Sequence, residues 1–123
     1  MDLPHFELGY PRTALRQKLV DAALRGDKTA TAGLYEQNEP LPRVGDRSVL
    51  LGFDDEPVAV VETTEVRVVR AGDVDLAFAV DEGEGFETVA DWRLAHENFW
   101  ADRQIDDETL IVAVRFALVE RLD

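Results

Sequence analysis

The chain has no cysteine, a single serine at Ser48 and only two histidines, His5 and His96. The absence of cysteine excludes disulfides, thiolate metal sites and a cysteine nucleophile, and it fits a reducing cytoplasm. Ser48 lacks the glycine-flanked pattern of a serine hydrolase, and the two histidines lack the spacing of a zinc hydrolase. The chemistry left open is that of lysine, threonine and carboxylate groups, and we expect neither a metal nor a cofactor.

Long apolar runs and glycine-rich phosphate loops are also missing. No run approaches the roughly 18 apolar residues that a membrane span needs, so we expect no membrane partner and a cytoplasmic location. Neither GxGxxG nor GxxxxGK[ST] occurs, which excludes the common nucleotide cradles. With 123 residues and 46% hydrophobic content, the chain has the size of one globular domain, spanning residues 1–123.

Positive charge is scarce, since 13 lysines and arginines face 26 acidic residues, for a net charge of −13. Phosphate backbones attract proteins through basic side chains, so broad binding to duplex DNA is not expected. Residues 12–28 differ, because five basic and two acidic residues there give +3 and leave −16 for the rest. This segment predicts either a solvated helix face or a local cationic face for a small anion or a short single strand.

Three helices are predicted. The first covers residues 12–25, because Pro11 suits a first helical position, apolar residues recur at helical spacing, and Gly26 suits the C-terminal cap. A short helix is expected over residues 73–79. The third helix begins after Thr88, with Asp91 completing a capping box. In this helix Trp92, His96 and Trp100 fall near one stripe, which favours a hydrogen-bonded histidine in an aromatic core.

Three apolar segments alternate in the manner of strands, at residues 47–53, 58–69 and 110–119. The turn residues at 54–57 predict a hairpin between the first two. In the second segment, either Glu62 interrupts an apolar face, or a bulge near Thr63 and Thr64 switches faces and turns Glu65 inward. The predicted fold class is α+β, with a small β-barrel or a strongly curved mixed sheet, flanking helices, and a core that receives Leu15, Leu19 and Trp92.

The stretch GDKTAT, residues 26–31, places an amine and two hydroxyls at the end of the first helix. One interpretation is a solvated turn. The other is a site, because a lysine whose pKa is lowered by burial can take the proton of a threonine hydroxyl. A carboxylate from the acidic loop 81–85 would then orient the amine, which points to Lys28, Thr31 and Glu84, with Thr29 as the turn residue.

Four motifs in order carry a resemblance to a known family. They are GDKTAT after a helix, LPRVGD at residues 41–46, ETTEV at residues 62–66, and EGEG at residues 82–85 followed by Trp92, Arg93 and His96. From about residue 10 onward the chain resembles the ASCH domain family, whose fold is similar to the PUA RNA-binding domain. The resemblance implies a small barrel with flanking helices and an association with RNA and modified nucleosides.

The resemblance also implies roles for particular residues. Small bacterial members include amidohydrolases that deacetylate N4-acetylcytidine with a lysine, a threonine and a glutamate, and other members are linked to ribonuclease activity. The family's lysine falls on Lys28, its last threonine on Thr31, and its glutamate on Glu84. This chain resembles the longer subgroup with EGEG and a Trp-Arg-His helix, in which the glutamate equally matches Glu82.

Three hypotheses of function follow, and the oligomeric state is not predicted. In the first, a modified nucleobase such as N4-acetylcytidine enters a cleft, where Thr31 attacks the amide carbonyl and Lys28 accepts its proton. In the second, the same cleft binds or cuts short single-stranded RNA, with phosphate on Lys28 and Arg25 and a base on Tyr35 or Phe86. In the third, the chain is a non-catalytic interaction module. The expected substrate-binding residues are Arg25, Thr29, Tyr35, Glu65, Glu82, Phe86 and Arg93.

Overall fold

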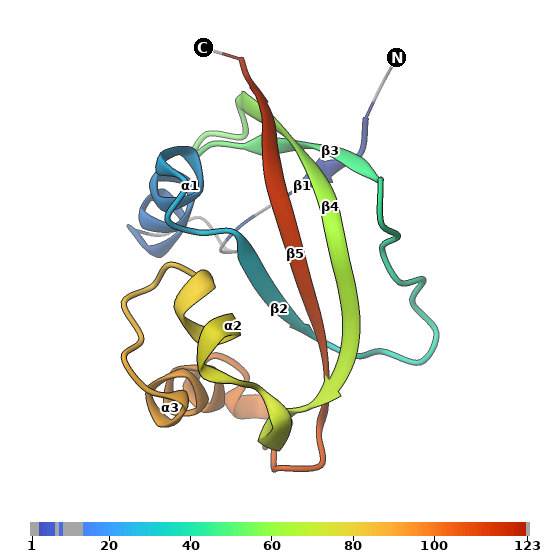
Figure 1. Cartoon of the computed structure of the whole chain (residues 1–123), viewed down its shortest axis with the longest axis vertical. Coiled ribbons are helices and arrows are strands. Elements are labelled where there is room, and N and C mark those ends of the chain that lie inside the picture. The colour runs from blue at the N-terminus through green and yellow to red at the C-terminus, as the bar shows by residue number, and fades with distance from the viewer. Residues whose placement is uncertain (1–2, 7, 9–13, 123) are drawn as a thin grey trace.

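The computed structural model describes residues 3–6, 8 and 14–122 and shows an open, five-stranded mixed sheet with three helices (Figure 1). The strand order is β1-β3-β4-β5-β2, in which β1 runs parallel to β3 and the other pairs are antiparallel. The strands are β1 (His5–Phe6), β2 (Ala30–Leu34), β3 (Arg47–Leu51), β4 (Pro57–Arg70) and β5 (Leu110–Arg121). The predicted α+β class is confirmed, and of its two forms the curved mixed sheet is present rather than a closed barrel.

The helices are α1 (Ala14–Arg25), α2 (Leu76–Asp81) and α3 (Val89–Phe99), with short 3-10 turns at Ala71–Asp73 and Ala101–Arg103. Gly26, at φ 85°, follows α1 as predicted, whereas the expected start of that helix at Pro11 and residue 12 lies outside the described residues. Thr88 and Asp91 form the predicted capping box of α3. None of the described helices is long and apolar enough to cross a membrane.

The helix predicted at residues 73–79 lies further along the chain. The carboxylate of Asp75 accepts a hydrogen bond from the backbone N–H of Phe78, so Asp75 is the N-cap and the helix starts at Leu76. The first predicted strand is also shorter than expected. Strand β3 ends at Leu51, because Gly52 to Glu56 form the turn that leads into β4. The predicted hairpin of β3 and β4 is confirmed.

A bulge divides β4 into two parts that face different cores. Thr63 pairs with Phe116 and Glu65 pairs with Arg115, so Thr64 is one residue more than β5 provides. Phe116 and Arg115 are neighbours on β5 and therefore face opposite sides of the sheet, so their partners Thr63 and Glu65 also point to opposite faces, although they are two residues apart. Of the two alternatives for this strand, the bulge is therefore confirmed, but Glu65 is not turned inward, because its side chain is 45% exposed.

Each face of the sheet is covered by a separate hydrophobic core, and in Figure 1 α1 lies beside the upper part of the sheet and α2 and α3 beside the lower part. All three residues predicted for the core are at least half-buried, but they belong to two cores and not to one: Leu19 and Leu15 lie under α1, and Trp92 is fully buried in the other core. The α1 core consists of Leu8, Leu19, Val20, Ala23, Leu50, Ala59, Val61 and Phe116. The α3 core consists of Ala30, Ala71, Val74, Phe78, Ala79, Trp92, Ile111 and Ala113.

The basic face expected on the first helix is only partly exposed. Lys18 and Arg25 lie at the surface, but Arg16 is 1% exposed and faces the turn between β3 and β4. Its Nε donates to the carbonyl oxygen of Gly52 at 3.2 Å, and its Nη2 donates to Asp55 at 2.7 Å. Arg16 therefore joins α1 to the hairpin and is not available to an anion.

Replacing Arg16 by methionine should lower the free energy of unfolding by on the order of 2 kcal/mol, because a buried carbonyl oxygen loses its charged donor. The matched control is Lys18→Met on the exposed side of α1, which should change stability by less than about 0.5 kcal/mol. Urea unfolding followed by circular dichroism gives both values. Equal effects of the two substitutions would contradict a structural role for Arg16.

Candidate functional site

Lys28 lies between the end of α1 and the start of β2, and its side chain points inward. The backbone N–H groups of Asp27 and Lys28 both donate to the carbonyl oxygen of Ala22, which turns the chain sharply after α1. Lys28 is only 2% exposed. Its Nζ donates to the carbonyl oxygens of Ala30, at 2.8 Å, and Glu82, at 3.1 Å. The stretch GDKTAT is therefore not a solvated turn at its lysine.

The acidic loop after α2 packs directly on this turn. Nζ of Lys28 lies 3.7 Å from Oε2 of Glu84, which is within ion-pair distance. Between the two glutamates, Gly83 adopts φ 69°, and a Cβ atom there would lie 2.6 Å from the carbonyl oxygen of Asp27 and 2.7 Å from Cα of Lys28. Only glycine permits this close approach, which brings both carboxylates to one amine.

Glu82 is 1% exposed and belongs to a second buried network. The indole Nε1–H of Trp92 donates to Oε2 of Glu82, and Nε2 of His96 lies 3.6 Å from the same oxygen. Nδ1 of His96 is 2.8 Å from the carbonyl oxygen of Trp92, which can only accept, so Nδ1 carries the proton. In the neutral ring, Nε2 therefore presents its lone pair toward Glu82.

Burial is the largest influence on the pKa values of Lys28, Glu82, Glu84 and His96. It lowers the pKa of Lys28 and of His96, and it raises the pKa of Glu84. It also raises the pKa of Glu82 to about 7, even though Lys28 and Trp92 favour the charged carboxylate. Burial thus brings the pKa values of the amine and the carboxyl groups closer together, which lowers the free energy of a proton transfer between them.

These groups line one pocket of about 160 Å³, which we call the Lys28 pocket. Its polar residues are Lys28, Thr31, Glu82, Glu84 and His96, and its apolar wall consists of Leu8, Leu19, Ala32, Ala95, Phe99 and Trp100. The structure thus brings together the lysine, the threonine and both candidate glutamates. Within the described residues, no group of three or more acidic or histidine side chains is arranged to hold a metal ion.

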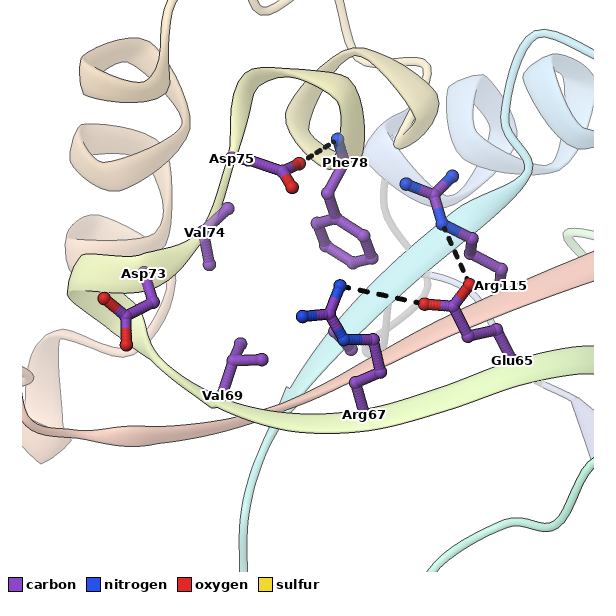
Figure 2. A pocket seen from close by; sticks show the side chains of 9 residues that line it. Glu65, Arg67, Val69, Asp73, Val74, Asp75, Phe78 and Arg115 are labelled. Carbon is purple, nitrogen blue, oxygen red and sulfur yellow. Dashed lines mark hydrogen bonds and ion pairs between the residues drawn. The ribbon is translucent and has the colours of Figure 1, made fainter.

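Other expected binding residues lie outside this pocket. Glu65 lines a different pocket, between β4, β5 and α2, where it lies 3.9 Å from both Arg67 and Arg115 (Figure 2). Arg93 projects from α3 and pairs with Glu97 and Asp107.

The remaining expected residues do not line the Lys28 pocket either. Arg25 pairs with Asp27 at the surface. The backbone of Thr29 bonds to Asp81 and Phe116, Tyr35 bonds through its backbone to Leu110, and Phe86 packs against the α3 core. None of these contacts offers a base-stacking surface inside the pocket.

Sequence reasoning missed two features of the Lys28 pocket, namely the contact of His96 with Glu82 and the identity of the apolar wall. The spacing of His96 between two tryptophans correctly predicted a buried, hydrogen-bonded ring, and it stacks on Trp92 with centroids 4.1 Å apart. The position of His96 beside Glu82, however, depends on where the acidic loop packs. The apolar wall from Leu8, Phe99 and Trp100 carries no motif that would distinguish it from ordinary core.

Comparisons with known proteins agree with this architecture. A family model described as the ASCH domain matches residues 8–120. A crystal structure of an ASCH domain from Lactobacillus crispatus JV V101 superposes with a TM-score of 0.86 at 26% identity, covering 97% of this chain and 80% of that one. A protein from Enterococcus faecalis V583 gives a TM-score of 0.83 at 25% identity, covering 99% of this chain and 84% of that one. A further hypothetical protein, at 16% identity, shares the fold alone, with a TM-score of 0.63 over 85% of this chain and 94% of that one.

No match to the chain was found among curated protein sequences. The fold is that of a PUA-like α+β domain. The chain belongs to the ASCH domain family, which is generally associated with RNA.

The raised pKa of Glu82 predicts how stability changes with pH. In the unfolded chain Glu82 titrates near 4.5 and in the fold near 7, so its protonated form is favoured by folding. The stability that it contributes is complete below about pH 4.5 and is lost as the pH rises to 7, by on the order of 3 kcal/mol.

Glu82→Gln, which keeps an acceptor for Trp92, should therefore gain stability over the wild type as the pH rises from 4.5 to 7. Denaturant unfolding at intervals of half a pH unit measures this difference, with the exposed Glu39→Gln as control. If the free energy of unfolding changed with pH in the same way for the wild type and Glu82→Gln, Glu82 would be charged in the folded protein.

His96→Ala should lower the free energy of unfolding by on the order of 1 to 3 kcal/mol, because a buried ring that packs against two tryptophans is removed and the carbonyl of Trp92 loses its side-chain donor. The control is His5→Ala, since His5 is exposed. Thermal unfolding of both variants gives the comparison. Unchanged stability of His96→Ala would leave only a chemical role for this residue.

Proposed function

We propose that the protein hydrolyses an acyl group from the exocyclic nitrogen of a modified nucleobase, with N4-acetylcytidine as the model substrate. The observation that carries this proposal is the buried amine of Lys28, which shares a pocket with the hydroxyl of Thr31 and the carboxylate of Glu84. An amide is a poor electrophile, so its cleavage at neutral pH needs an activated nucleophile and a proton for the leaving nitrogen.

Lys28 is suited to act as the base that activates Thr31. Burial lowers the pKa of its amine, and two backbone carbonyls accept two of its N–H groups. A neutral amine has two N–H groups, so its lone pair is then directed away from both carbonyls and is free to take a proton. Thr31 attacks the acyl carbon as Lys28 accepts the hydroxyl proton, and a C–O bond forms.

The carboxylate of Glu84 is suited to stabilise the protonated Lys28 at 3.7 Å and to relay a proton. When the C–N bond breaks, the leaving nitrogen receives the proton that Lys28 took from Thr31. The deacylated nucleoside leaves at this point, and water then hydrolyses the acyl ester of Thr31, with Lys28 again as base, which releases the carboxylic acid and restores the Thr31 hydroxyl. The steps balance without a metal, an oxidant or a further co-substrate.

The charge of the chain supports an uncharged substrate. A net charge of −13 repels long phosphate backbones, whereas a nucleoside brings no phosphate. The surface arginines expected to bind substrate add little, because Arg25 already pairs with Asp27 and Arg93 with Asp107.

Incubation of the purified protein with N4-acetylcytidine should release cytidine and acetate, measured by liquid chromatography. Lys28→Ala and Thr31→Ala should each lower kcat by at least about 100-fold, because each removes a group that takes part in the chemical step. Thr29→Ala is the matched threonine control and should keep turnover, at some cost in stability.

Circular dichroism shows whether each variant is folded. Release of cytidine by folded Lys28→Ala at the wild-type rate would refute this mechanism. The same preparations incubated with a short single-stranded RNA test the second hypothesis, in which the strands would be bound or shortened while acetylcytidine stays intact. If neither substrate reacts, the non-catalytic hypothesis remains.

A further inference from the structure

Two of the sequence motifs contribute nothing to the Lys28 pocket. The LPRVGD segment and the first threonine of ETTEV instead border a second cleft of about 690 Å³. Its floor is formed by Thr31, Ser48, Thr63 and Val114 of the sheet, and its wall by residues 40–43 and Asp46. Thr31 thus lines both spaces, and we call the second one the Thr31 cleft.

The strand register places three hydroxyl groups on the face of the sheet that forms this floor. Thr31 of β2 pairs with Val114 of β5, and Phe116, two residues further on β5, pairs with Thr63 of β4. Val61, two residues before Thr63, pairs with Ser48 of β3. Paired residues, and residues two apart on a strand, share a face, so Thr31, Thr63 and Ser48 form a diagonal row.

The spacing of this row matches a small ligand. With strands about 4.8 Å apart and a rise of about 3.4 Å per residue, Thr31 and Thr63 are separated by roughly 12 Å along the diagonal. That is about the length of one nucleoside. Thr63 is 6% exposed, so the cleft reaches a residue that is otherwise part of the interior.

The wall of the cleft is fixed in place beside Thr63. The N–H of Gly45 donates to the carbonyl oxygen of Thr63 at 2.8 Å, and the N–H of Thr63 donates to that of Asp46 at 2.9 Å. Oδ2 of Asp46 accepts from the backbone N–H of Arg43 at 2.9 Å. Among the described residues nothing bonds to Oδ1 of Asp46, which leaves a carboxylate oxygen to accept from a ligand. Figure 1 shows the segment that carries this wall crossing from the lower end of β2 to β3.

We infer that the Thr31 cleft binds the ribose of a ribonucleoside whose acyl group enters the Lys28 pocket. This inference rests on the proposed function, because it places the scissile carbonyl at Thr31. The smaller space, about 160 Å³, receives the short acyl group, and the larger one, about 690 Å³, receives the base and sugar. The hydroxyls of Thr63 and Ser48 and the carboxylate of Asp46 pair with the sugar's hydroxyls, and Pro40, Leu41 and Pro42 cover its apolar face.

The test compares three substrates that differ only in the sugar: N4-acetylcytidine, N4-acetyl-2′-deoxycytidine and N4-acetylcytosine. The wild type should show at least about a tenfold higher kcat/KM for the riboside than for the free base, with the deoxyriboside between them. Asp46→Asn and Thr63→Val should each reduce the ratio of riboside to free-base kcat/KM by at least about tenfold. Thr64→Val, on the exposed bulge residue, is the matched control and should keep the wild-type ratio.

A binding experiment separates this inference from the proposed hydrolysis. Cytidine added to ¹⁵N-labelled protein should shift the amide resonances of residues 43–48 and Thr63, and cytosine alone should not. These shifts without any hydrolysis would support the ribose site and refute the hydrolase. The ribose site would be overturned by equal kcat/KM values for the riboside and the free base, or by resonance shifts confined to other parts of the sheet. If Thr63→Val fails to fold, the kcat/KM ratio of Asp46→Asn decides between these outcomes.

Discussion

The buried amine of Lys28 holds together two segments that are distant in the sequence, the turn that leads into β2 and the loop that follows α2. Its acceptors come from the start of β2 and from the end of α2, and its carboxylate partner from the loop that follows. A buried amine without such acceptors would leave its N–H groups unsatisfied, at a cost of several kcal/mol, so the two segments are stable only when they are docked on one another. The pocket and the packing of α2 on the sheet therefore depend on the same amine.

Much of the fold could be predicted because its longer strands alternate clearly. Strands β3, β4 and β5 and the caps of α1 and α3 follow from local patterns of apolar residues, glycine and threonine. Strand β2 could not be predicted, because Ala30 to Leu34 contain small residues and a glycine and are strand only through pairing with β5. Strand β1 has two residues, too few to show any periodicity.

The candidate site was predictable in its residue types but not in its geometry. The GDKTAT motif identifies Lys28 and Thr31, but it does not show which glutamate faces the amine. The structure brings both, because Gly83 permits the loop to touch the turn and the two carboxylates take different partners. The burial of Arg16 was equally hidden, since a basic residue on a helix is solvated unless a distant hairpin supplies its acceptors.

The extra residue at Thr64 lets one strand serve two unlike surfaces. Thr63 faces the hydroxyl-lined cleft, and Glu65, two positions on, faces the arginine-lined pocket of Figure 2 on the other side of the sheet. The one extra residue therefore sets which face of the sheet Thr63 and Glu65 occupy. Insertions and deletions are therefore restricted along β4, where they would exchange the two surfaces.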